Sequence, residues 1–439
     1  MKHRMIGTMV MLGVALSVAP AFAQDRVAEL ERKVDVLTEE IEKMRLGAVA
    51  DTTAYAARLG FAPAASKVYA KGRGVSIGGY GEMLAERQDR ERQDGTPSGG
   101  IERIDFLRAI VYVGHKFNDE LLFNSELEWE HSGVRDEAEV SVDTGTGEGS
   151  AELTGEATLE FAYLDWSRRR SFGVRAGKLL TPVGLINEQH EPPVFNGARR
   201  SETERRIIPT TWSGNGVGVF GELENGLAYR AYVIEGLNAE HFDAANAIRG
   251  GRQAGSQSLL RHPAFVARLD WTSATGLLVG GSAFTGNAAQ TGATFSPTVT
   301  LLEAHARYQR NGVDARGLFV RGTLNDASLL SDALGLIGSD RLGESFFGGY
   351  VEVAYDVAQQ ISAGARYGLA PYLRYEVNDT QEDVPGPGLE DPAQRHRILT
   401  AGLAFRPDPN VVVKLDREQR RDDARTGTSQ WNAAVGYLF

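Results

Sequence analysis

The chain contains no cysteine, and that absence excludes several kinds of site at once. A disulfide framework, a thiolate metal site and a cysteine nucleophile all need a thiol. Lysine is also scarce, because only eight of the 47 basic residues are lysine and the rest are arginine. Since the formal net charge is −11, the chain is not expected to bind nucleic acid, which requires an excess of positive charge.

Long apolar runs are missing as well. Apolar residues make up 42% of the chain, yet no stretch after residue 23 reaches the ~18 consecutive apolar residues of a membrane-spanning helix. This absence excludes helical spans only. A membrane β-barrel alternates apolar and polar residues along each strand, so its average hydropathy is unremarkable.

The N-terminus predicts export from the cytoplasm. Residues 2–4 are basic, residues 6–18 are mostly apolar, and Ala21-Phe22-Ala23 matches an A-x-A cleavage site. This order of features is typical of a secretory signal peptide. We therefore expect residues 1–23 to be removed and to take no part in the fold.

Residues 24–46 carry a heptad pattern. The spacing between successive apolar residues alternates between three and four at Val27, Leu30, Val34, Leu37, Ile41 and Met44. This pattern predicts a short α-helical coiled coil, which we expect in the periplasm, followed by a linker over residues 47–74. A single amphipathic helix that packs on a partner is an alternative that three heptads leave open.

From residue 75 to 439 the periodicity changes to two, which is the pattern of β-strands. Short turns such as Asn311-Gly312 alternate with long connections at 88–100, 132–156, 181–213, 237–262, 287–297, 325–345, 380–395 and 420–429. The strands number ~16, an even count typical of outer-membrane barrels. Residues 356–368 are either an extended turn or a strand pair. The expected fold class is all-β, a 16-stranded antiparallel transmembrane β-barrel that follows the coiled coil.

The strands also have two unlike faces, as expected where a barrel wall separates lipid from a water-filled lumen. The polar face carries the arginines Arg108, Arg268, Arg307 and Arg374, which we expect to line the lumen. On the strand of Arg108, the apolar face is expected to hold Leu107 together with Ala109, Val111 and Val113.

A soluble β-sandwich would alternate in the same way, but the C-terminus favours a membrane barrel. Trp431, Ala433, Val435, Tyr437 and Phe439 fall on one face of the last segment. A last strand that ends in Phe resembles the outer-membrane assembly signal of barrel proteins. We therefore expect the assembly machinery to contact Phe439.

The stretch Thr181–Trp212 interrupts the strand pattern. A segment of this length without periodicity is uncommon in a compact domain and is usually functional or disordered. It contains the arginines Arg199, Arg200, Arg205 and Arg206 and the carboxylates Glu188, Glu191, Glu202 and Glu204. We expect residues 181–213 to fold inward as a constriction loop, with the arginines binding anions and the glutamates as counter-charges. For any single arginine, a salt bridge that only stiffens the lumen is the alternative.

Three patterns that could indicate an enzyme do not fit their structural context. Gly216–Gly221 has the spacing G-x-G-x-x-G but lies inside a strand, not at the start of a helix. His190-Glu191 lacks the second histidine of H-E-x-x-H. No G-x-S-x-G motif stands out, and no histidine is tied by spacing to a serine. We therefore expect no catalytic residues, no metal site and no cofactor.

The segment from Lys178 to Gly218 resembles the third-loop region of the phosphate-selective porin family (the O/P type). The resemblance rests on Pro182-Val183-Gly184, Asn187-Glu188, His190-Glu191-Pro192, Phe195 and Ile208-Pro209-Thr210-Thr211-Trp212. The segment Pro371–Glu376 is also similar to that family's strand with an Arg-Tyr-Glu core. The resemblance implies a homotrimeric 16-stranded porin whose third loop narrows the lumen, in contact with the lipid bilayer and lipopolysaccharide of the outer membrane.

In one respect the chain departs from the phosphate-specific members, which are similar in having a lysine-rich extracellular funnel. Here the long loops are nearly free of lysine and rich in carboxylates. Phosphate, another anion and general diffusion of small hydrophilic solutes therefore all remain open. We expect a passive porin in the Gram-negative outer membrane with its N-terminus in the periplasm. The alternative is a structural barrel that tethers the envelope through its coiled coil.

Overall fold

A computed structural model describes residues 60–132, 138–143, 148–153, 155–385 and 390–439. The expected signal peptide (1–23), the expected coiled coil (24–46) and the first part of the expected linker lie outside the described residues. The extended hairpins that the sequence predicts make up most of what is described. Among these residues no helix is long and apolar enough to cross a membrane.

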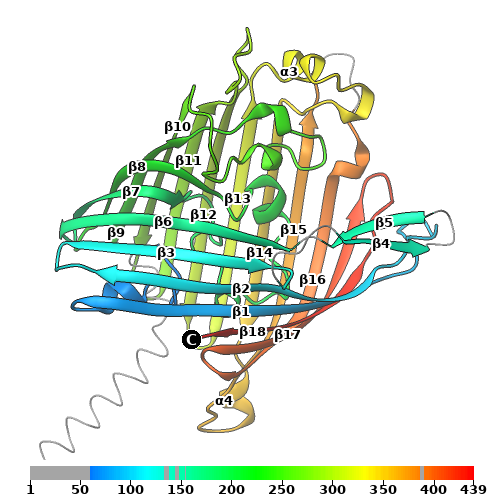
Figure 1. Ribbon diagram of the computed structural model, residues 1–439. Helices are drawn as coiled ribbons and strands as arrows, with labels where there is room; N and C mark the ends of the chain where they lie inside the picture. Colours follow the sequence, from blue (N-terminus) through cyan, green and yellow to red (C-terminus); the bar gives the residue numbers. More distant parts are fainter. Residues whose placement is uncertain (1–59, 133–137, 144–147, 154, 386–389) are drawn as a thin grey trace, which may run out of the picture. The chain divides into compact units, whose positions relative to one another are not determined.

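Sixteen antiparallel strands form a closed barrel, as predicted, and β1 closes the ring by pairing with both β2 and β18 (Figure 1). The barrel strands are β1 (Gly74–Gln88), β2 (Glu102–Lys116), β3 (Leu121–Glu130), β6 (Glu156–Arg169), β7 (Phe172–Leu180), β8 (Ser213–Glu222), β9 (Leu227–Glu235), β10 (Pro263–Thr272), β11 (Leu277–Asn287), β12 (Thr298–Arg310), β13 (Val313–Leu324), β14 (Ser345–Tyr355), β15 (Gly368–Asp383), β16 (Arg395–Asp408), β17 (Val411–Asp422) and β18 (Gln430–Leu438).

The connections contain short helical turns and one additional hairpin. The turns are η1 (Lys67–Ala70), η2 (Pro192–Val194), η3 (Thr203–Ile207), η4 (Ala239–His241), η5 (Arg249–Gly251), α3 (Ala327–Ala333), η6 (Gly338–Asp340), α4 (Ala358–Ile361) and η7 (Pro392–Gln394). The hairpin, β4 (Ala138–Asp143) with β5 (Glu148–Leu153), forms a separate two-stranded sheet in the connection 131–155. The sequence analysis did not predict it.

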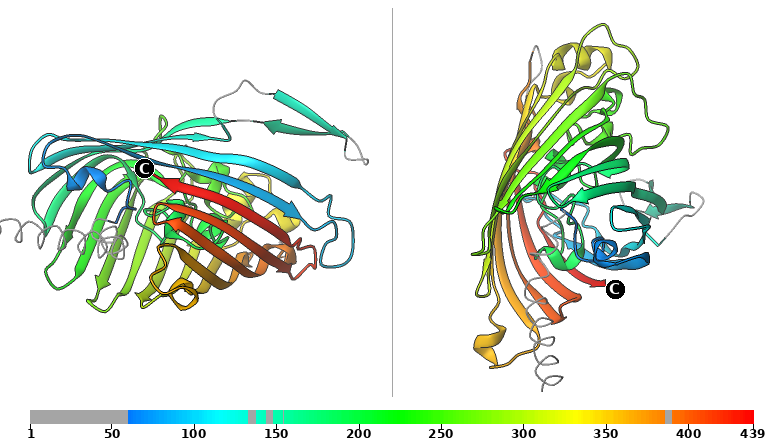
Figure 2. Two further views of the ribbon diagram at one scale, coloured as in Figure 1. Left: turned by 90° about the horizontal axis from the view of Figure 1, so that it is seen from below. Right: turned by 90° about the vertical axis from the view of Figure 1, so that its left-hand side faces the viewer.

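Short turns and long loops alternate around the ring, so that the short turns share one rim of the barrel (Figure 2). Residues 356–367 are an extended turn that contains α4, and not a strand pair. This asymmetry of the two rims is typical of barrels inserted in an outer membrane. We refer below to the short-turn rim and the long-loop rim.

The inward and outward faces follow the alternation of the sequence. On β10, Phe265 and Leu269 are 57% and 51% exposed, whereas Arg268 and Asp270 are 7% and 4% exposed. The same alternation holds on β12 and β15, where Leu302 and Leu373 face outward. The barrel wall therefore has an apolar outer surface and a charged inner surface.

Strand β2 is an exception to the predicted faces. Glu82 of β1 pairs with Arg108, but Leu84 pairs with Asp105, so β2 contains one additional residue at this point. Such a β-bulge shifts the alternation by one. The prediction that Leu107 shares the outer face with Ala109 is therefore wrong, because Leu107 lines an interior cavity beside Arg108.

Loops that fold into the barrel supply much of its apolar core. Ile207 and Ile208 are fully buried, and the ring of Trp212 packs against Phe284 of β11 with 4.7 Å between ring centroids. Both isoleucines and Trp212 belong to a buried apolar cluster that also includes residues of β11, β12, β13 and β14. This packing fixes the loop inside the barrel.

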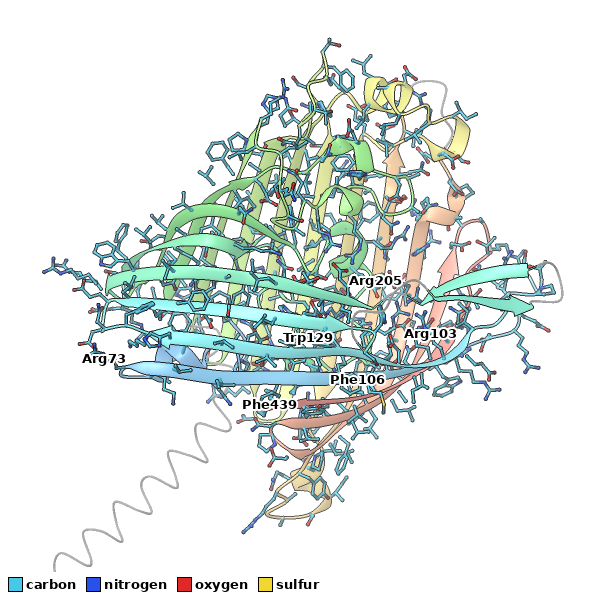
Figure 3. The ribbon with its side chains drawn as sticks, viewed as in Figure 1. Arg73, Arg103, Phe106, Trp129, Arg205 and Phe439 are labelled. Carbon is cyan, nitrogen blue, oxygen red and sulfur yellow. The ribbon has the colours of Figure 1, made fainter. Side chains whose placement is uncertain are left out.

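The C-terminal aromatic residues cover glycines at the seam between β18 and β1. Gly81 pairs with Tyr437, and Gly79 exchanges backbone hydrogen bonds of 3.1 and 3.0 Å with Phe439, which lies beside β1 (Figure 3). A Cβ atom on Gly81 would lie 2.5 Å from the Tyr437 ring, and one on Gly79 would lie 2.6 Å from the Phe439 ring. The two glycines therefore make room for the two rings.

We expect Gly81→Val to lower the free energy of unfolding by about 1–3 kcal/mol, because the new side chain overlaps the Tyr437 ring. Urea titration of the refolded barrel, followed by tryptophan fluorescence, measures the change. Gly81→Val/Tyr437→Ala is the matched control, since removing the ring should restore most of the loss. A Gly81→Val variant as stable as the parent would contradict this account of the seam.

Candidate functional site

The loop 181–212 is closed at its base by one asparagine. The Asn187 amide donates to the carbonyl oxygens of Thr181 (2.7 Å) and Trp212 (2.8 Å), and its Oδ1 accepts from the Trp212 amide (2.8 Å). The Thr181 amide also donates to Trp212 O at 2.8 Å. Asn187 therefore joins the two ends of the loop where β7 ends and β8 begins.

From this base the loop reaches the opposite wall of the barrel. The Ala198 amide donates to Asp416 of β17 (2.7 Å), the Thr203 amide donates to Glu376 of β15 (3.1 Å), and Tyr350 of β14 donates to Glu204 (2.8 Å). These partners are far from the loop in sequence but surround it in space. The loop therefore crosses the barrel interior.

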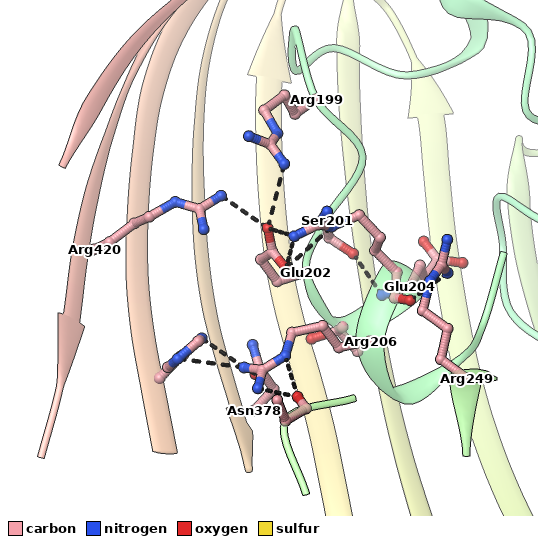
Figure 4. Close-up of polar contacts among 12 residues, drawn as sticks. Arg199, Ser201, Glu202, Glu204, Arg206, Arg249, Asn378 and Arg420 are labelled. Atoms are coloured by element: carbon pink, nitrogen blue, oxygen red, sulfur yellow. Dashed lines mark hydrogen bonds and ion pairs between the residues drawn. The ribbon is translucent and has the colours of Figure 1, made fainter. Parts of the chain in front are cut away.

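The four arginines of the loop separate into two groups. Arg206 donates to Asn378 Oδ1 (3.1 Å) and Gln394 Oε1 (2.8 Å) and also contacts the His396 ring (Figure 4). It is 6% exposed, so it anchors the loop to the wall. Arg199, Arg200 and Arg205 instead line an interior cavity.

Glu202 is the centre of a buried ionic cluster. It lies 2.8 Å from Arg205, 2.8 Å from Arg420 of β17 and 3.8 Å from Arg199 (Figure 4). Burial opposes its ionisation, but these three guanidiniums outweigh burial and hold the pKa of Glu202 well below its usual range. Glu202 is therefore ionised at neutral pH and offsets part of the positive charge of the loop.

The other predicted counter-charges have other partners. Glu188 lies 3.5 Å from Arg230 and 3.9 Å from Arg268, and Glu204 accepts from the amides of residues 185 and 186. Glu191 accepts from the amides of residues 64 and 65, and burial raises the pKa of Glu191 to about 7. Of the four, only Glu202 pairs with arginines of the loop.

All four predicted wall arginines face inward and have carboxylate partners. Arg108 lies 3.5 Å from Glu128 and 3.3 Å from Glu130, and it also lines the cavity. The remaining pairs are Arg268 with Asp270 at 2.9 Å, Arg307 with Asp314 at 2.8 Å, and Arg374 with Glu352 at 3.5 Å. Arg268, Arg307 and Arg374 therefore belong to salt-bridged ladders. This was the alternative to anion binding that the sequence analysis gave for any single arginine.

The cavity measures about 650 Å³ and lies between the loop and the walls of β1, β2, β3 and β6. Its lining includes seven arginines (Arg103, Arg108, Arg199, Arg200, Arg205, Arg249 and Arg252) and six carboxylates (Glu82, Glu86, Glu130, Glu156, Glu160 and Asp243). Arg103 comes from β2 and Arg205 from the loop (Figure 3). Most of the carboxylates lie on the wall, whereas most of the arginines lie on loops, so charges of opposite sign face each other.

Two arginines of this cavity were missed by the sequence analysis. Arg249 donates to the carbonyl oxygens of Arg205 and Thr210 at 2.6 Å each, and Arg252 donates to that of Pro209 at 3.3 Å. Both lie in the connection 236–262 and hold the end of the loop 181–212. The motif Arg-Gly-Gly-Arg in a long connection was the available signal.

The guanidiniums around Arg249 are not fully compensated. Within the described part of the chain, Arg200, Arg249 and Arg252 make no ion pair with a carboxylate within 4.0 Å. Burial, together with repulsion from Arg252 and Arg205, lowers the pKa of Arg249 to about 9. Arg249 is still charged at neutral pH, and it differs from Arg199 and Arg205, which form ion pairs with Glu86 and Glu202.

No protein-family model matches the chain. It is 35% identical over 396 residues to an uncharacterized protein of Aquifex aeolicus (strain VF5), which covers 88% of this chain and 85% of that protein. The chain belongs to the family of that Aquifex protein. Membership in this family assigns no activity, because the name of that relative states none.

The fold of this chain is also similar to several solved barrels. A loop-deletion mutant of OmpT from Vibrio cholerae matches with a TM-score of 0.49 and 10% identity, covering 84% of this chain and 100% of that chain. The outer-membrane channel DcaP of Acinetobacter baumannii matches with a TM-score of 0.49 and 10% identity, covering 83% of this chain and 97% of that chain. An anion-selective porin from Comamonas acidovorans matches with a TM-score of 0.45 and 10% identity, covering 83% of this chain and 99% of that chain. These similarities are too weak to assign a function.

Proposed function

We propose that the protein is an outer-membrane porin through which small hydrophilic solutes diffuse passively. One observation carries this proposal: a closed barrel with an apolar outer face encloses a charged cavity that is bounded by a loop folded across the interior. An apolar exterior suits lipid, and charged groups beside a constriction select solutes by charge and size. Passage in this scheme involves no chemical reaction, so we propose no enzymatic activity and no cofactor.

We further propose that anions pass in preference to cations. The support is the group Arg200, Arg249 and Arg252, whose positive charge has no carboxylate partner within ion-pair distance among the described residues. Arginine offers a planar fork of donors that suits phosphate and carboxylate. Phosphate is thus one candidate among small anions, and the facing wall carboxylates favour modest rather than strict selectivity.

The proposed setting is the outer membrane of a Gram-negative envelope. There the barrel would form a homotrimer in contact with lipid and lipopolysaccharide, with Phe439 presented to the assembly machinery and the N-terminus in the periplasm. A tethering role through residues 24–46 is a second candidate. In that role a pull on residues 24–46 would reach the barrel along the continuous chain that enters β1 (Gly74–Gln88).

Planar-bilayer recordings under a salt gradient test the anion preference. We expect a reversal potential that favours anions, and Arg249→Gln/Arg252→Gln should lower the anion-to-cation permeability ratio about five-fold, as expected when ~1 kcal/mol of attraction is lost. Arg321→Gln is the matched control, because Arg321 is exposed and pairs with Glu382 at 2.8 Å away from the cavity. A reversal potential that favours cations would rule out the anion preference, and absence of channels would rule out the porin.

A further inference from the structure

Residues Gly60–Ala70, which precede the first strand, are packed inside the barrel near the short-turn rim. We call them the inner segment. Phe61 lies 5.6 Å from both Phe161 and Tyr163 of β6, measured between ring centroids. Val68 packs against Gly114 of β2, where an added Cβ would lie 2.7 Å from the Val68 Cβ. The small residue at 114 therefore leaves space for the inner segment.

Polar contacts hold the inner segment to three strands and to the loop 181–212. The amides of Ala64 and Ala65 donate to Glu191 Oε1 at 3.0 and 2.9 Å. On the other side, Asn124 of β3 donates to the Ala65 carbonyl at 3.0 Å. Glu191 is itself fully buried. The Glu191 carboxylate of the constriction loop therefore binds the main chain of the inner segment.

The aromatic residues of the inner segment surround a buried arginine. The Tyr69 hydroxyl donates to Asp165 of β6 at 2.7 Å and accepts from Arg175 of β7 at 3.0 Å. The guanidinium of Arg175 also lies 4.7 Å from the centroid of the Phe61 ring. A cation over an aromatic face is an attractive contact, so Phe61 and Tyr69 dock on the same charged pair.

Gly60 shows how far the inner segment reaches. An added Cβ at Gly60 would overlap the Arg230 guanidinium and lie 3.0 Å from Glu188 Oε1. Arg230 belongs to β9 and Glu188 to the loop 181–212. The inner segment therefore runs from beneath the constriction loop to the short-turn rim, through a part of the lumen that a solute would otherwise use.

We propose that the inner segment is a stopper that restricts passage on the short-turn side of the loop 181–212 and can be withdrawn. This proposal rests on the porin function, since a stopper needs a conducting barrel. Withdrawal is feasible because residues 71–73, which join the inner segment to β1, are exposed. No charged side chain of the segment forms an ion pair with the described wall. Withdrawal would therefore break apolar contacts, the contact of the Phe61 ring with Arg175, and hydrogen bonds such as those to Glu191 and Asp165.

Single-channel recordings of Phe61→Ser/Tyr69→Ser test the stopper. Loss of both rings should loosen the inner segment and raise the conductance about two-fold or more, because a wider lumen carries more ions. Lys71→Ser is the matched control, since Lys71 is exposed in the same stretch of chain. An unchanged conductance in the folded double variant would rule out the stopper and leave the porin standing. Absence of channels from the parent protein would instead remove the porin.

A reversible lock provides a second measurement that does not depend on the double variant folding. The chain has no cysteine, so Val68→Cys/Gly114→Cys introduces the only two thiols, with their Cβ atoms within about 1 Å of the usual disulfide separation. Oxidation with copper phenanthroline should abolish the larger conductance states, and dithiothreitol should restore them. In the Phe61→Ser/Tyr69→Ser background the lock should return the conductance to the parent value. Identical recordings in the oxidised and reduced states would overturn the proposal.

Discussion

Replacing Asp270 by alanine is expected to lower the free energy of unfolding by about 3–5 kcal/mol, since it removes one partner of a buried ion pair. Asp270 is 4% exposed. It lies 2.9 Å from Arg268, 2.9 Å from His305 and in hydrogen-bond contact with Arg230. The variant would leave two buried guanidiniums with fewer carboxylates around them, and a buried charge without a partner is costly.

Urea titration of the refolded barrel in lipid vesicles measures this loss. Asp423→Ala is the matched control, because Asp423 is 36% exposed and pairs with Arg397 at the surface. Exposed pairs contribute about 0–1 kcal/mol, so the control should unfold close to the parent. If both variants unfold alike, the inner ladder of charges does not stabilise the barrel, and Asp270 is retained for another reason.

Glu202→Gln is expected to raise the anion-to-cation permeability ratio about five-fold. The substitution removes the negative charge at the centre of the cluster and frees the charges of Arg199, Arg205 and Arg420. With an effective dielectric constant of about 20, a unit charge some 15 Å away contributes about 1 kcal/mol, which is about five-fold in a concentration ratio.

Because the pKa of Glu202 is held well below its usual range, the carboxylate stays ionised above the ordinary pKa of glutamate. The difference between parent and Glu202→Gln should therefore persist between about pH 5 and 8. Reversal potentials across this range measure it. Glu382→Gln, whose partner Arg321 lies outside the cavity, should leave selectivity unchanged. A shift toward cations in Glu202→Gln would contradict the assigned role.

The wall of the barrel was predictable because strand alternation is a local property. On β10, the residues on either side of Arg268 alternate in sequence as they do in space, and no partner needs to be known. The β-bulge in β2 was not predictable, since the additional residue is visible only in the pairing with β1. A shift of one residue then moved Leu107 from the outer face to the cavity.

The partners of the charges could not be derived from the sequence. Arg420 and Glu202 form an ion pair at 2.8 Å although they are 218 residues apart, and nothing local connects them. Sequence reasoning therefore found the arginine-rich loop but could not distinguish Arg206, which anchors it, from Arg200, which lines the cavity. Arg249 and Arg252 were missed because a long connection gives no periodicity from which to place them.

The inner segment differs from its sequence expectation for another reason. Residues 47–74 read as a linker because they are rich in alanine and lack periodicity. In the structure, Ala62, Ala64 and Ala65 are at most 3% exposed. Small side chains allow a main chain to pass close to a wall, so the same composition suits a narrow lumen as well as a linker.

The glycines at the seam also bear on how the ring closes during assembly. A slip of β18 along β1 by one residue would exchange the inner and outer faces, and lipid would oppose it. A slip by two residues would leave each side chain of β18 on its own face of the barrel, so lipid would not oppose it. It would, however, place Tyr437 opposite Met83, or Phe439 opposite Ile77, where no glycine leaves room for a ring. Together the two ring-and-glycine contacts therefore favour one register between the first and last strands over registers shifted by two residues.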